Sequence, residues 1–369
     1  MERPVMRLIP IHRCEPGMKL GRKIYNEEGL VLLSEQVELT GGLIRRLEQM
    51  GIAYIYIADA RTEDVTIPDL ISDDTRRRVM FEIRSNFKRI MDEAGRKRNV
   101  VQPTMGKDFR NVMQVLIDDL GSHKDAMIML TNMSITDLYL YEHSLNVCIY
   151  STMLGMADGY NREELMTLGL GALLHDVGKT KIPVEILHKP HALSESEFET
   201  MKKHAELGFR ILKDEPNIPL LSAHCAFQHH ERMNGTGYPR GIGGEDIHDY
   251  AKWIGLVDSY DAMISHRVYR KAMLPHQAME MLYTGSGTLY EQSKLEAFRD
   301  KVALYPVGVS VMLHSGEKGV VVDINSSFPQ RPIIRVLQDA EGQDLKQMYE
   351  IDLSKNLNVM IAQVNDQFV

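Results

Sequence analysis

Helix-start signals recur through one long stretch of the chain, residues 108–303, and favour helices throughout it. Two capping boxes pair a polar N-cap residue with a glutamate three positions later, and two prolines stand where a helix can begin. These signals are Asn161 with Glu164, Ser194 with Glu197, Pro219, and Pro275. No repeat or low-complexity segment interrupts the stretch. We therefore predict an all-helical domain over residues 108–303.

Strand-like patterns flank this helical region on both sides. In residues 1–70, short apolar runs surround one helix that Thr40 can cap, and after Tyr305 apolar residues alternate with polar ones. The predicted strands are Leu20–Tyr25, Leu30–Leu33, Ile52–Ile57, and runs at Val309, Val320, Ile333 and near Ile351. The predicted fold is thus mainly α, with a small N-terminal α+β module at 1–70 and a small C-terminal all-β module at 304–369. The N-terminal module serves either for packing or for sensing and partner binding.

A charged helix with one apolar stripe is predicted within residues 71–107, which we expect to link the first module to the helical domain. Its apolar residues follow a three-four spacing: Met80, Ile83, Phe87, Ile90 and Ala94. Such a stripe in the helix 73–98 is either the seam of a homodimer or a face packed on the chain's own domain. The spacing does not separate these alternatives.

Charge and cysteine usage restrict the partners and the compartment. A net charge of −8 over 369 residues disfavours a surface for a nucleic acid polymer. Cys14, Cys148 and Cys225 form no C-x-x-C pair, which disfavours a disulfide framework or a thiolate zinc site and suits a reducing cytoplasm. No apolar run approaches the roughly 18 residues that span a bilayer. We expect a cytoplasmic protein without a membrane segment.

The segment LLHDVGKTKIP, residues 173–183, places His175 and Asp176 side by side, with Lys179 three residues later. A helix beginning after Asn161 would carry them, and Gly178 is a natural stop for that helix. A nitrogen ligand, an oxygen ligand and an ammonium group together suit a metal and a phosphate. A single HD dipeptide also occurs by chance, so its meaning depends on the rest of the chain.

Further residues of ligand type are distributed along the helical region. Imidazole and carboxylate groups without thiolate suit iron, manganese or zinc, and seven such groups suffice for two metals that share a carboxylate. The candidates are His143, His175, Asp176, His204, His229, His230 and Asp258. Two metals about 3.5–4 Å apart can activate a water and clamp a phosphoryl oxygen, which is the chemistry of phosphoester hydrolysis. Asp176 is the expected bridge.

Each of these residues also has an ordinary structural interpretation. A lone histidine on an apolar helix, such as His143, is more often a hydrogen-bonded core residue than a ligand. The glycine-rich turn Asn234–Gly241 either approaches a ligand closely or is a surface turn. Arg267 either pairs with a substrate phosphate or bridges to Asp261, and spacing does not choose between them.

The ordered motifs HDVGK, KKHAELG, HHERMNGTGYPRG and VDSYDAMISHRVYR, preceded by an EHS helix, resemble the HD-GYP family of cyclic di-GMP phosphodiesterases. The resemblance covers roughly residues 138–303. It implies an all-helical HD domain, metal binding by the seven candidates, and substrate contact by Lys179, Arg267 and Tyr238. Asn234 and His266 depart from the family pattern, where aspartates are usual, but neither is an inferred ligand.

The resemblance implies hydrolysis of cyclic di-GMP to linear pGpG or on to GMP, with Asp176 and Lys179 as the catalytic residues. Some family members hold a third metal with a glutamate four residues before the first helix histidine, where this chain has Tyr139. We therefore expect two divalent ions, iron or manganese. The alternatives are a hydrolase of another cyclic dinucleotide or nucleotide, and a non-catalytic signalling scaffold.

Overall fold

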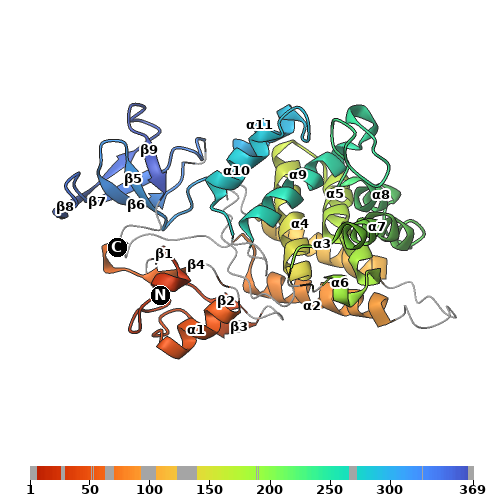
Figure 1. Cartoon of the computed structure of the whole chain (residues 1–369), viewed down its shortest axis with the longest axis horizontal. Coiled ribbons are helices and arrows are strands. Elements are labelled where there is room, and N and C mark those ends of the chain that lie inside the picture. Colours follow the sequence, from red (N-terminus) through yellow and green to blue (C-terminus); the bar gives the residue numbers. More distant parts are fainter. Residues whose placement is uncertain are drawn as a thin grey trace.

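The computed structural model describes residues 6–25, 30–50, 52, 54–62, 70–92, 105–122, 139–187, 189, 191–265, 272–325 and 327–364. The helical region forms one end of the molecule, and the two small modules lie together at the other end (Figure 1). The Tyr56 hydroxyl donates a hydrogen bond to the carbonyl oxygen of Val307 at 3.2 Å, which joins the two modules. The predicted fold class is confirmed.

Four helices of the helical region begin at the predicted start signals, including the helix that follows Pro219. Asn161 and Glu164 form a complete capping box, as do Ser194 and Glu197, and Pro275 is the first residue of its helix. The helices are α3 (Met105–Ser122), α4 (Tyr139–Ala157), α5 (Arg162–Leu174), α6 (Val184–Leu187), α7 (Glu195–Leu212), α8 (Leu220–Gln228), α9 (Asp249–Ile264), α10 (Pro275–Thr284) and α11 (Gln292–Arg299). None of the described helices is both long and apolar enough to cross a bilayer.

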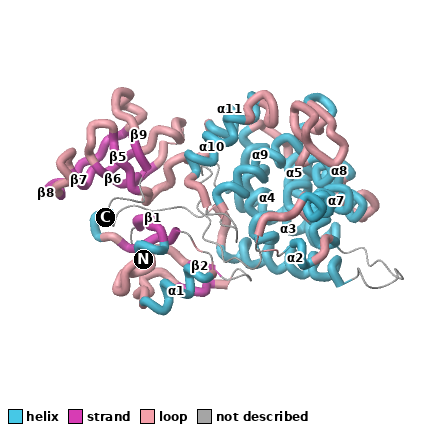
Figure 2. The backbone as a smooth tube through the Cα atoms, viewed as in Figure 1, coloured by secondary structure: helices cyan, strands magenta, loops and turns pink. Residues whose placement is uncertain are grey.

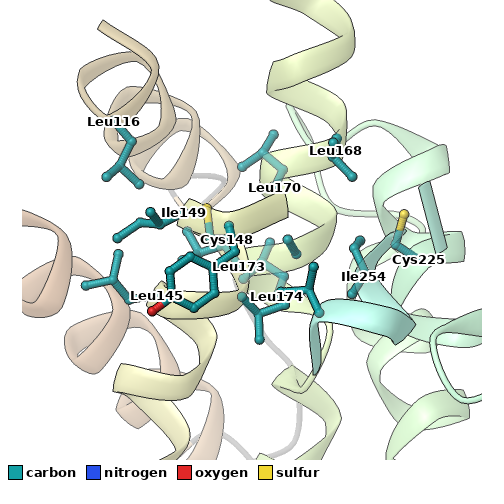
Figure 3. Packing of buried hydrophobic residues seen from close by; sticks show 14 of the residues in the cluster. Leu116, Leu145, Cys148, Ile149, Leu168, Leu170, Leu173, Leu174, Cys225 and Ile254 are labelled. Carbon is teal, nitrogen blue, oxygen red and sulfur yellow. The ribbon is translucent and has the colours of Figure 1, made fainter. Parts of the chain in front are cut away.

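Helices α4 and α5 form the centre of the core. Both are apolar around most of their circumference, and such a helix is stable only when other elements surround it. Figure 3 shows Leu145 and Cys148 of α4 beside Leu173 and Leu174 of α5, with Ile254 of α9 close by. In this arrangement α4, α5 and α9 pack against one another.

Helix α2 (Asp73–Asp92) packs on the helical region through its apolar stripe. The residues of the stripe that the structure describes are all buried: Met80, Ile83, Phe87 and Ile90. The Phe87 and Tyr141 rings pack edge to face with their centroids 5.6 Å apart. The stripe is thus a face packed on the chain's own domain, against α3 and α4, and a homodimer through the helix 73–98 stays a prediction. Ala94 lies outside the described residues.

Where the structure describes it, the N-terminal module contains two short antiparallel strand pairs and one α-helix. β1 (Met6–Pro10) pairs with β4 (Tyr54–Ala58), and β2 (Ile24–Tyr25) pairs with β3 (Val31–Leu33). Helix α1 (Gly41–Gln49) is capped as predicted, since the Leu43 backbone N–H donates to Thr40 Oγ1 at 3.2 Å. The sequence did not predict β1, whose partner strand lies more than forty residues away.

The C-terminal module is a five-stranded antiparallel sheet with the strand order β8-β7-β6-β5-β9 (Figure 2). Its strands are β5 (Ser310–Leu313), β6 (Lys318–Asp323), β7 (Ile333–Gln338), β8 (Asp344–Asp352) and β9 (Ile361–Val364). Val311, Val320 and Val336 are buried in its hydrophobic cluster. The backbone N–H of Leu8 donates to the Gly308 carbonyl oxygen at 2.8 Å, so β1 continues onto this module. β9 was not predicted.

Candidate metal centre

The HD segment leaves α5 earlier than the sequence suggests. The helix ends at Leu174, and after Asp176 the chain continues as a 3-10 helix, η5 (Val177–Lys181), so the predicted stop at Gly178 is wrong. Gly178 is instead required by a close backbone contact, because a Cβ at this position would lie 1.9 Å from the His204 carbonyl oxygen. The glycine allows η5 to press against the backbone of α7, which carries His204.

All seven predicted ligands converge from separate elements of the helical region. His143 lies on α4, His204 on α7 and Asp258 on α9, while the adjacent pairs follow the ends of α5 and α8. They form two groups in which the potential ligand atoms lie within 4.8 Å of one another. The triple-histidine group comprises Asp176, His204, His229 and His230, and the paired-histidine group comprises His143, His175 and Asp258.

Asp176 lies between the two groups and is fully buried. Its Oδ2 lies 3.3 Å from His175 Nε2 and 3.8 Å from His143 Nε2. Its Oδ1 lies 3.4 Å from His204 Nε2 and 3.8 Å from His229 Nε2. One carboxylate therefore presents a different oxygen to each group, which is the geometry of a bridging ligand.

Asp258 also faces both groups. Its Oδ1 lies 3.0 Å from His143 Nε2 and 3.9 Å from His175 Nε2, whereas its Oδ2 lies 3.9 Å from His230 Nδ1. The two carboxylates thus stand among five imidazole rings. Adjacent rings, such as those of His143 and His175, have centroids 5.2 Å apart.

Backbone carbonyls orient three of the imidazole rings. The Nδ1 atoms of His175 and His204 lie 2.7 Å from the carbonyl oxygens of Ala172 and Met201, and His229 makes the same contact with Ala226 at 3.0 Å. An N–H directed at a carbonyl fixes the tautomer and leaves the other ring nitrogen unprotonated. Each of these rings therefore turns its Nε2 toward the carboxylates as an acceptor.

The protonation states in the triple-histidine group are those of metal ligands. Burial lowers the pKa of His204 to about 4, although Asp176 opposes this shift. Burial and neighbouring histidines hold the pKa values of His229 and His230 well below their ordinary value. Burial alone would raise the pKa of Asp176, but Lys179 and His175 outweigh it and hold that pKa well below its usual range. Neutral imidazoles and an ionised carboxylate are the forms that bind divalent ions.

His143 is different, because two carboxylates surround its ring. Burial lowers its pKa, but hydrogen bonds with Asp258 and Asp261 outweigh that effect and raise the pKa to about 9. A cation bound at Nε2 would compete with this proton.

The residues fit a divalent metal on independent grounds. His175 Nε2 and Asp176 Oδ1 are buried and make no hydrogen bond to any described residue. Buried polar atoms are normally satisfied, so such atoms at the centre of a His and Asp cluster are available as ligands. The donor set of imidazole and carboxylate suits iron, manganese or zinc. HD domains bind divalent metals, and this cluster is compatible with that property.

Lys179 projects from η5 onto this cluster. Its Nζ lies 2.5 Å from Asp176 Oδ2, and 18% of its side chain is exposed. The ammonium group is thus beside the central carboxylate and reachable from solvent. Arg267 and His266 lie outside the described residues, so both interpretations of Arg267 stay predictions.

Tyr238 of the glycine-rich loop covers the triple-histidine group. Its ring stacks on His230 with centroids 4.6 Å apart and meets the His204 ring edge-on at 6.2 Å. Sequence reasoning missed the residue that holds this loop, Glu231. Its carboxylate is buried and accepts backbone N–H groups of Arg240 at 2.8 Å and Ile242 at 3.1 Å. The sequence signal that could have identified Glu231 is its position directly after His229 and His230.

Two family models match the chain. One, described as an HD domain, matches residues 114–293, and the other, described as a KOW domain associated with HD domain, matches residues 310–367. Among solved structures, Bd1817, described as an HDG"Y"P protein from Bdellovibrio bacteriovorus, matches with a TM-score of 0.50 and 18% identity. That match covers 80% of this chain and 98% of Bd1817, and it shows a shared fold.

Curated relatives share more of the sequence. Cyclic di-GMP phosphodiesterase PA4108 of Pseudomonas aeruginosa is 32% identical over 248 residues, which cover 65% of this chain and 59% of that protein. A cyclic di-GMP phosphodiesterase of Thermotoga maritima is 37% identical over 164 residues, 44% of each chain. The 3'3'-cGAMP-specific phosphodiesterase 3 of Vibrio cholerae is 31% identical over 180 residues, 49% of this chain and 39% of that protein. The chain spans about half the length of the curated relatives it matches.

Proposed function

The chain belongs to the HD-GYP family, and from this premise we propose that it is a metal-dependent phosphodiesterase that hydrolyses cyclic di-GMP. The position of Asp176 carries the proposal. Its two oxygens face two groups of nitrogen ligands at 3.3 and 3.4 Å, as a carboxylate shared by two ions requires. Bound metals would supply Lewis acidity and an activated water at the phosphodiester.

We propose two divalent ions, iron or manganese, held by the seven residues of the two groups. The triple-histidine group and the paired-histidine group each offer enough ligands for one ion when Asp176 is shared. A third ion has no obvious ligand in the sequence, since Tyr139 offers only a phenol, which is a poor ligand for hard cations.

The chain's own residues would hold the substrate against the metals. Lys179 is a protonated amine beside Asp176, and we assign it to a non-bridging phosphate oxygen, where it offsets the charge that develops during reaction. We assign Arg267 to the same phosphate and Tyr238, through its position over His230, to the rest of the nucleotide. Asp176 and Lys179 are the proposed catalytic residues, and the product is linear pGpG or GMP.

A second substrate has support from the relatives. Proteins of Vibrio cholerae named as 3'3'-cGAMP-specific phosphodiesterases match this chain at 29–31% identity, so another cyclic dinucleotide is the main alternative. A non-catalytic signalling scaffold is less compatible with the site, because all seven ligand positions carry a metal-binding residue type.

We further propose a division into four parts: residues 1–70, a linker at 71–107, the catalytic domain at 108–303, and the β module at 304–369. Cyclic di-GMP is a bacterial second messenger, and the three free cysteines suit a reducing compartment, so we assign the reaction to the cytoplasm.

The proposal is tested by anaerobic purification of the full chain, elemental analysis, and hydrolysis assays with cyclic di-GMP, 3'3'-cGAMP and cyclic di-AMP in parallel. We expect about two metals per chain and fastest turnover of cyclic di-GMP. Faster hydrolysis of 3'3'-cGAMP would establish the alternative substrate. A metal-replete protein that hydrolyses none of the three would refute the enzymatic assignment, and three metals per chain would refute the dinuclear one.

A further inference from the structure

Asp261 is a carboxylate outside the seven candidate ligands that contacts one of them directly. It lies on α9 one helical turn after Asp258, is fully buried, and its Oδ2 is 2.7 Å from His143 Nδ1. The opposite ring nitrogen, His143 Nε2, is 3.0 Å from Asp258 Oδ1. His143 is therefore held between two carboxylates of the same helix.

This arrangement distinguishes His143 from three other histidines of the centre. His175, His204 and His229 direct Nδ1 at a neutral carbonyl three residues earlier on their own chain segment. A carboxylate accepts a stronger hydrogen bond from Nδ1–H than a carbonyl does. The opposite nitrogen, Nε2, then becomes a more basic ligand for a cation. Of these four histidines, only His143, in the paired-histidine group, has a charged residue at its Nδ1.

Asp261 is fully buried with few polar neighbours. Among the described residues, its one ion-pair partner is His143, and its second oxygen, Oδ1, makes no hydrogen bond. The Ser265 hydroxyl adds a hydrogen bond to Oδ2 at 3.3 Å. A buried carboxylate is stable only beside a group that offsets its charge. The His143 ring lies between Asp261 and the other ligands, so a cation bound at its Nε2 would also offset this charge through the ring.

We propose that Asp261 is a positioning residue that orients His143 and selectively strengthens metal binding by the paired-histidine group. The inference rests on the metal centre of the proposed function and is independent of its substrate. Loss of such a partner typically weakens metal binding by about 10–100-fold. The triple-histidine group contains no residue in contact with Asp261 among the described residues, so its affinity should not change.

The test is a titration of the metal-free full chain with Mn²⁺, in which free Mn²⁺ is followed by its electron paramagnetic resonance signal. Wild type should bind two ions. Asp261→Ala should bind one with unchanged affinity and the other about 10–100-fold more weakly. Asp261→Asn keeps an acceptor oxygen but loses the charge, so it should give a smaller loss. Asp249→Asn is the matched control, because Asp249 lies on the same helix and pairs with Lys294 and Tyr160 instead.

A second comparison separates positioning from general damage. His143→Ala should retain only the ion of the triple-histidine group, and adding Asp261→Asn should leave that remaining affinity unchanged. Wild-type affinity for both ions in Asp261→Ala, or equal weakening of both, would overturn the proposal. A further loss of affinity for the remaining ion in the double variant, His143→Ala with Asp261→Asn, would also overturn the proposal. No cyclic dinucleotide enters the experiment, so failure of the substrate assignment would leave this result unaffected.

Discussion

The backbone of Gly178 lies directly against that of His204, so closely that a Cβ on Gly178 would be 1.9 Å from the His204 carbonyl oxygen. Gly178 belongs to η5, which follows Asp176, and His204 belongs to α7. The contact therefore sets the distance between the central carboxylate and one of its histidine neighbours.

Gly178→Ala should destabilise the protein and weaken metal binding, because backbone atoms on both sides must move. Overpacking of this kind costs about 1–3 kcal/mol, or more where backbone resists. Thermal unfolding with and without Mn²⁺ measures both effects. Gly121→Ala is the control, since a Cβ there meets no atom within 4 Å. In helix α3 it should be neutral or stabilising by up to about 1 kcal/mol. Equal stability of the two variants would contradict the packing argument.

Asp176→Asn should abolish hydrolysis while the fold is kept. The amide has the size of the carboxylate but no charge, and only one of its two terminal atoms can bind a cation. Turnover should fall by at least about 10²–10³-fold, as it does when a central electrostatic group is lost. Turnover of metal-replete enzyme under saturating cyclic di-GMP is the measurement, and Asp214→Asn, an exposed aspartate on the surface, is the control. Near wild-type turnover would remove Asp176 from the mechanism.

Lys179→Ala should impair catalysis without loss of metal. A protonated amine cannot ligate a metal, whereas its contact with a phosphate is a charged hydrogen bond worth about 1.5–3 kcal/mol. We expect kcat/KM to fall about 10–100-fold at constant metal content. Lys189→Ala removes the same charge from a surface pair with Glu197 and should leave kcat/KM unchanged. Metal loss in Lys179→Ala would instead assign the lysine to holding Asp176 in place.

Glu231→Ala should raise KM more than it lowers metal content. The carboxylate accepts two backbone N–H groups of the loop that carries Tyr238, and each such charged hydrogen bond contributes about 1.5–3 kcal/mol. Without it, the loop should sample positions in which Tyr238 leaves His230. Glu245→Ala, at an exposed glutamate after the same loop, is the control. An unchanged KM in Glu231→Ala would show that the loop does not contribute to substrate binding.

The sequence alone determined the features that depend on neighbouring residues. The capping boxes of α5 and α7 join residues three positions apart, so their helix starts could be predicted and are confirmed. The seven candidate ligands could be named because the motifs fix residue type and order. The expectation that Asp176 lies at their centre agrees with its position between the two groups, although its role as a ligand stays a proposal.

Only the tertiary structure decided the features that join distant segments. The apolar stripe of α2 fitted both a dimer seam and an internal face until its contacts with α3 and α4 were known. Gly178 makes its close backbone contact with His204 of another helix. Asp261 pairs with His143, which lies more than one hundred residues earlier in the chain. Local periodicity records which face of a helix is apolar or polar. It does not record which other segment meets that face, because packing between remote elements is fixed by the whole core.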